Sequence, residues 1–168
     1  MDHFTRLGLP RRFSLDSAAL EREYLARSRA IHPDYHQLGS SAEQAASVEW
    51  SAALNEAYTT LKDPFKRAEY LMQLEGGPSA GELKDMPPEF LEEMLDLRME
   101  MAELEPDSPA AATMESQLAA RRDGLLTRVG ALLEGLAPET RTAQLVEARR
   151  LLNGTKYVQN LIRDLRAL

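Results

Sequence analysis

Two histidines, His32 and His36, lie four residues apart, the spacing at which a helix places two imidazoles beside one metal ion. Pro33 falls between them, and a proline disfavours helix both at its own position and at the residue before it. Asp34 is the only other residue nearby of a suitable ligand type. A metal-dependent hydrolase built on these histidines is therefore the least favoured class of function, and we expect no metal site.

Other catalytic chemistry finds little support. The chain has no cysteine, which excludes thiol nucleophiles, thiolate metal sites and disulfides. It contains no G-x-S-x-G motif and no glycine-rich loop after a strand that could hold a phosphate. Acidic residues are frequent after position 88, but carboxylates on a solvated helix face have no reason for a raised pKa. We expect no catalytic residue and no cofactor, and hence not an enzyme.

The tripeptide His32-Pro33-Asp34 lies between two long helical segments. Pro33 makes the turn rigid, Asp34 can cap amides or present a carboxylate, and His32 offers a donor and an acceptor. Taken alone, the tripeptide is explained by an ordinary helix-ending turn. Arg22 and Arg29, however, lie seven residues apart on the exposed face of the preceding helix. This basic stripe beside the turn favours a binding role.

The N-terminal half predicts helices that end at recognisable signals. Asp16 or Ser17 begins a helix to about Ile31, and the capping box at residues 40–43 begins another that ends at Asp63-Pro64. A short helix then covers about 65–74. Four apolar residues of the second helix are expected to face inward: Val48, Leu54, Tyr58 and Leu61.

The C-terminal half predicts three helices in an antiparallel bundle. They cover about 88–105, 109–136 and 140 to the end, with a weak point expected at Asn153-Gly154. Residues 76–88 contain three Gly and three Pro, which indicates a linker. The fold class is therefore all-α, with an N-terminal domain at 1–75, a linker at 76–88 and a C-terminal three-helix domain at 89–168.

The helix beginning near Phe90 carries two apolar stripes. At about 100° per residue, one stripe contains Phe90, Met94, Leu97, Met101 and Leu104. The second contains Leu91, Leu95 and Ala102, and beside it lie Glu92, Asp96, Met99 and Glu103. From the residues alone, the second stripe is either a protein-binding strip or a surface that packs on a neighbouring helix.

Charge and hydropathy limit the partners. The net charge of −7 disfavours nonspecific nucleic-acid binding. No run approaches the roughly 18 apolar residues of a membrane span, and the N-terminus lacks the apolar core of a signal peptide. We expect a cytoplasmic protein with neither nucleic acid nor membrane as a partner.

Three motifs together resemble a J-domain. They are Phe4-x-x-Leu7-Gly8-Leu9-Pro10, then His32-Pro33-Asp34, and then Asn55-Glu56-Ala57-Tyr58-x-x-Leu61-x-Asp63-Pro64. The following Arg67-Ala68-Glu69-Tyr70-Leu71 is similar to the sequence found in the HscB family of J-domain co-chaperones for iron–sulfur cluster assembly. The resemblance extends over the C-terminal helices and so over essentially the whole chain. It implies an N-terminal J-domain helical hairpin followed by the three-helix bundle.

The resemblance also implies partners and residues. The J-domain would contact the Hsp70-class chaperone HscA and stimulate its ATPase through Arg22, Arg29, His32, Pro33 and Asp34. The bundle would bind the scaffold protein IscU through Leu91, Glu92, Leu95, Asp96, Met99, Glu103 and Leu151. Tyr35 stands where many J-domains carry a basic residue, and Glu92, Met99 and Leu151 also differ from the residues frequent in the family. The alternative is a general J-domain co-chaperone with a different client.

Overall fold

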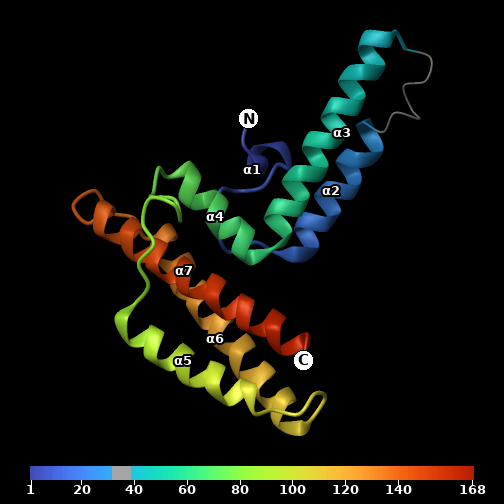
Figure 1. Cartoon of the computed structure of the whole chain (residues 1–168). Helices are drawn as coiled ribbons and strands as arrows, with labels where there is room; N and C mark the ends of the chain where they lie inside the picture. The colour runs from blue at the N-terminus through green and yellow to red at the C-terminus, as the bar shows by residue number, and fades with distance from the viewer. Residues whose placement is uncertain (32–38) are drawn as a thin grey trace. The chain divides into compact units, whose positions relative to one another are not determined.

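The computed structural model describes residues 1–31 and 39–168, and every regular element in these ranges is a helix (Figure 1). The all-α fold class is thereby confirmed. The contacts divide the chain into two compact units, Met1–Tyr70 and Leu71–Leu168. No helix within the described ranges is long and apolar enough to cross a membrane.

The first unit is built around a hairpin of two long helices, α2 (Ser17–Ile31) and α3 (Ser41–Lys62), which lie side by side in Figure 1. The short α1 (His3–Arg6) packs on α3. Tyr24 of α2 and Tyr58 of α3 stack with ring centroids 4.1 Å apart. The buried side chains of this unit are mostly apolar and include Phe4, Leu7, Leu20, Leu54, Ala57 and Leu61.

The helix-ending signals act as the sequence predicts. The carboxylate of Asp16 accepts a hydrogen bond from the Ala18 amide at the start of α2. Ser40 and Glu43 form the complete capping box of α3. Asp63 ends α3, and its side chain also accepts from the Lys66 amide at the start of α4 (Pro64–Leu74), a helix that continues past the boundary between the units.

The prediction that Val48 of α3 faces inward is wrong. Val48 is 56% exposed, whereas its neighbour Ser47 is buried and donates a hydrogen bond of 2.7 Å to the Ile31 carbonyl at the end of α2. Ser47, Leu54 and Leu61 are seven residues apart and share one face of the helix. Val48 lies about 100° away from that face.

The second unit contains α5 (Pro88–Ala102), α6 (Pro109–Glu134) and α7 (Arg141–Arg166). The principal packing is between α6 and α7, and α5 packs against α7 through its buried residues Phe90, Met94 and Met101. The segment before α5 lies against α7. The side-chain amide of Asn153 on α7 donates hydrogen bonds to the carbonyls of Leu83 and Asp85, at 2.9 and 2.8 Å. Residues 83–85 are thereby fixed to the bundle.

The weak point expected at Asn153-Gly154 is absent, since α7 is continuous from Arg141 to Arg166. Gly154 is buried and faces the ring of Phe90 on α5. A Cβ at this glycine would lie 3.4 Å from Phe90 Cε1. The glycine therefore admits an aromatic ring from the neighbouring helix and does not interrupt α7.

Candidate protein-binding surfaces

The exposed face of α2 carries both arginines of the predicted basic stripe. Arg22 and Arg29 are exposed, and together with Ala18, Glu21, Leu25 and Ala26 they line a shallow groove. Leu25 is an exposed apolar residue between the two arginines. The groove therefore combines two cations with an apolar centre, a composition suited to binding another protein.

Leu25 is the residue of this face that sequence reasoning missed. It lies three residues after Arg22 and four before Arg29, so helical spacing alone places it between them. The sequence does not make the exposure of Leu25 obvious, because the apolar periodicity of α2 is weak. Leu20 and Tyr24 already supply the inward contacts of this helix. Arg27 behaves differently from the other two arginines, because it pairs with Glu23 and lies against the backbone of Gly8.

Three of the predicted chaperone-binding residues, His32, Pro33 and Asp34, lie outside the described residues. Their position in the chain is nevertheless informative, because α2 ends at Ile31. The tripeptide therefore follows directly on the helix that carries Arg22 and Arg29.

The second surface is a strip along α5. Leu91, Leu95 and Met99 are 44%, 57% and 71% exposed, and their spacing of four residues places them on one side of the helix. We call these three residues the α5 strip. Of the other predicted stripe, Phe90, Met94 and Met101 are buried, whereas Leu97 and Leu104 are half-buried.

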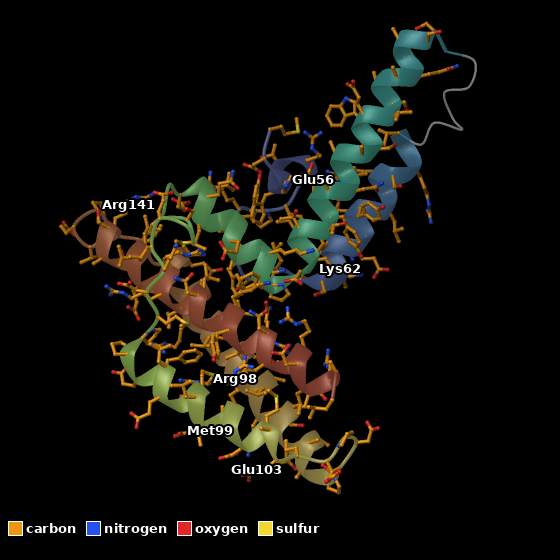
Figure 2. All side chains as sticks on the ribbon, viewed as in Figure 1. Glu56, Lys62, Arg98, Met99, Glu103 and Arg141 are labelled. Atoms are coloured by element: carbon orange, nitrogen blue, oxygen red, sulfur yellow. The ribbon has the colours of Figure 1, made fainter. Side chains whose placement is uncertain are left out.

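Acidic side chains surround the α5 strip. Glu92, Asp96 and Glu103 are exposed, and none of the three has an ion pair within the described part of the chain. Figure 2 labels Met99 and Glu103 on this helix, with Arg98 nearby. The basic Arg98 is directed to Asp164 of α7, at 3.5 Å, and to the ring of Tyr157. The strip therefore carries uncompensated negative charge.

Leu151 requires a correction. It was predicted to belong to the same surface as the α5 strip, but its side chain is completely buried. The apolar face of α7 is broad, and both Leu151 and Leu152 lie within the core of the second unit. Leu151 supports the bundle from inside and is not available to a partner.

No group of three or more His, Cys, Asp or Glu residues within 1–31 and 39–168 is arranged to hold a metal ion. Burial lowers the pKa of His3, whose ring stacks on Tyr70 with centroids 4.3 Å apart, and burial also lowers the pKa of Arg67. Neither group adjoins the α5 strip in sequence or lies in the groove on α2. Arg98, by contrast, lies next to Met99 on α5, and its hydrogen bond with Tyr157 raises its pKa.

Comparison with known proteins agrees with this geometry. Residues 86–166, which contain α5, α6 and α7, match the family model described as the HSCB C-terminal oligomerisation domain. The solved structure of the chaperone HscB from Vibrio cholerae superposes with a TM-score of 0.81 at 26% identity, covering 99% of this chain and 96% of that one. The chain belongs to the HscB family. The human co-chaperone protein HscB gives a TM-score of 0.84 at 27% identity, covering 99% of this chain and 81% of the human one.

Membership of the HscB family accounts for both units, since the structural likeness extends over nearly the entire chain. The two HscB relatives are named a chaperone and a co-chaperone.

Proposed function

We propose that this HscB-family protein is a co-chaperone in iron–sulfur cluster assembly. It stimulates the ATPase of an HscA/DnaK-type chaperone and delivers the scaffold protein IscU to that chaperone. Residues 1–75 serve as the J-domain and residues 89–168 as the scaffold-binding domain, joined through 76–88. The protein catalyses no reaction of its own, and its contribution is to bind two partners.

The observation that carries the proposal is the α5 strip. Exposing Leu91, Leu95 and Met99 in a row is unfavourable in water, because burying each such side chain would contribute about 1.5–3 kcal/mol. Contiguous apolar side chains with a polar border are typical of a protein interface. The acidic border formed by Glu92, Asp96 and Glu103 predicts a client surface that is apolar at its centre and basic at its edge.

The groove on α2 supports the other half of the proposal. Arg22 and Arg29 attract an acidic surface on the chaperone, and Leu25 adds apolar contact between them. His32, Pro33 and Asp34 come next in the chain and would complete this contact. Charged residues at the edge of such an interface mainly increase the rate of encounter, so the contact should be sensitive to salt.

The test is the ATP hydrolysis rate of HscA, measured with this protein alone and with this protein plus IscU. We expect stimulation by the protein alone and a larger stimulation when IscU is added. His32→Gln should abolish both while leaving the circular dichroism spectrum unchanged. Stimulation by the protein without any increment from IscU would identify the general J-domain co-chaperone with a different client.

A further inference from the structure

The helix α5 carries two apolar stripes about a third of a turn apart, and either stripe could pack on the bundle. Phe90, Met94 and Met101 are buried, whereas the α5 strip is exposed. Apolar burial has no preferred direction, so burying either stripe would contribute a similar free energy. Turning α5 about its own axis would bury the strip and expose the residues that now pack. Something other than apolar contact must therefore select the observed orientation.

The start of α5 is held from outside the helix. Pro87 at its N-cap makes no side-chain hydrogen bond. The side-chain amide of Asn153 on α7 instead donates two hydrogen bonds to the segment before α5, to the carbonyl of Leu83 at 2.9 Å and to that of Asp85 at 2.8 Å. Hydrogen bonds are directional, so this pair fixes where the chain enters α5.

The packing around Gly154 favours one of the two stripes. A Cβ on this glycine would lie 3.4 Å from Phe90 Cε1. The ring of Tyr157 meets the Phe90 ring edge to face, with centroids 6.4 Å apart. If α5 turned and presented Leu91 at this place, the smaller side chain would leave part of the space empty, and the lining would lose contacts. The space on α7 therefore fits the stripe that contains Phe90.

Arg98 holds the later turns of α5 to the same helix. Its guanidinium lies 3.5 Å from a carboxylate oxygen of Asp164 and 5.7 Å from the ring centroid of Tyr157. Asn153, Tyr157 and Asp164 are separated by four and seven residues and so share one face of α7. On α5, Arg98 lies between the buried stripe and the α5 strip. Turning the helix to bury the strip would therefore carry Arg98 away from Asp164.

We infer that Asn153 and Asp164 of α7 are positioning residues for the client, because they select the orientation of α5 in which the α5 strip faces outward. The inference rests on the proposed function, since it names residues that act on the client through the strip. A turned α5 would hide the strip, and the apparent affinity for the client falls in proportion to the fraction of molecules that expose it. The turned helix would still bury one apolar stripe, so folding stability should change much less than client affinity.

The test compares two double variants that make the same chemical changes in different places. Arg98→Gln/Asn153→Asp removes the cation that pairs with Asp164 and the two amide donors. Arg163→Gln/Asn160→Asp is the matched control. Arg163 pairs with the same Asp164 from within α7, and Asn160 makes no hydrogen bond in the described part of the chain.

Titration calorimetry with purified IscU should show about tenfold weaker binding for Arg98→Gln/Asn153→Asp, since three directional contacts are lost. The control should bind nearly as well as the unaltered protein. Net charge changes equally in the two variants. Loss of Arg98 also makes the surroundings of the α5 strip more negative, which would favour a basic client, so charge alone does not explain weaker binding.

The orientation of α5 has a separate readout, because the chain contains no cysteine. Leu95→Cys places a single thiol in the α5 strip, and Met94→Cys places one in the buried stripe. In the control and in the otherwise unaltered protein, a maleimide should react quickly with the Leu95→Cys thiol and slowly with the Met94→Cys thiol. In the Arg98→Gln/Asn153→Asp background, the first reaction should slow and the second should accelerate.

Faster reaction at both thiols would mean that α5 has loosened without turning, which would overturn the inference. Equal labelling rates and equal IscU affinities in the two double variants would also overturn it, while the α5 strip continued to account for binding. If the unaltered protein fails to bind IscU, the proposed function fails, whereas the labelling rates still decide whether α7 orients α5. The two failures are thus distinguishable.

Discussion

A single step along α5 separates side chains that stabilise the bundle from side chains that face solvent. Phe90 and Met94 are buried against the other helices, whereas Leu91 and Leu95 are exposed. Because adjacent helical residues point about 100° apart, two neighbouring apolar residues can serve different purposes. Substitutions at adjacent positions should therefore affect different properties, partner binding at one position and folding stability at the next.

Replacing Leu91 and Leu95 together by alanine should weaken IscU binding by at least about 2 kcal/mol, roughly thirtyfold, because exposed apolar anchors at an interface carry most of its energy. The same variant should melt at nearly the unaltered temperature. Titration calorimetry and thermal melts measure the two effects. Met94→Ala is the matched control, since it should cost about 2–5 kcal/mol of folding stability and leave the direct IscU contact unchanged. A large stability loss in the double variant would show that its leucines pack in the core.

His3 should make the stability of the first unit depend on pH. Burial lowers its pKa, although Glu56 and Asp2 act in the opposite direction. The unfolded chain therefore binds a proton more readily than the folded one, and the free energy of unfolding should decrease as pH falls below about 6.5. Trp50, the single tryptophan, reports unfolding of this unit by fluorescence. His3→Gln should reduce the slope between pH 7 and 5, and an identical slope in the two proteins would contradict the prediction.

At the scale of elements, the sequence predicts where helices end. It does not predict which residues of neighbouring helices contact one another. The caps at Asp16, Ser40 and Asp63 depend on residues within one turn, so local sequence determines them. The burial of Leu151 depends on how the broad apolar face of α7 meets α5 and α6. The role of Gly154 depends on Phe90, which is distant in the sequence. Such information lies in the packing of helices and not in the periodicity of any one of them.

The position of Gly154 leads to a prediction about α7. A Cβ there would make ordinary van der Waals contact with Phe90, at 3.4 Å. Gly154→Ala should therefore stabilise the bundle by up to about 1 kcal/mol, because alanine is the better helix former. Gly154→Leu should destabilise it, since the longer side chain needs the space that Phe90 occupies. Chemical denaturation of both variants provides the measurement, and a destabilising alanine would show that the space is smaller than described.

The basic face of α2 should act through long-range attraction. Arg22→Glu/Arg29→Glu should slow association with HscA, and added salt should slow the unaltered protein in the same way. Arg12→Glu/Lys66→Glu makes the same change in net charge outside the α2 groove and should have a smaller effect. Stopped-flow association at several salt concentrations distinguishes the two variants. An association rate independent of salt would exclude an electrostatic role for α2.

For the whole molecule, two surfaces on two compact units predict that the two activities can be separated. The variant Leu91→Ala/Leu95→Ala should stimulate HscA as well as the unaltered protein when IscU is absent, because the α2 groove is intact. It should lose the further stimulation that IscU provides. ATPase assays with and without IscU give both values, and loss of the basal stimulation would mean that the bundle also acts on the chaperone.

The α5 strip has one further consequence, which concerns oxidants. Met99 is its most exposed member, while Met94 and Met101 on the same helix are buried. Peroxide should therefore convert the Met99 thioether to the sulfoxide before those of Met94 and Met101, which places a polar group among apolar side chains. Preparations that have aged in air should lose client affinity without losing helical structure.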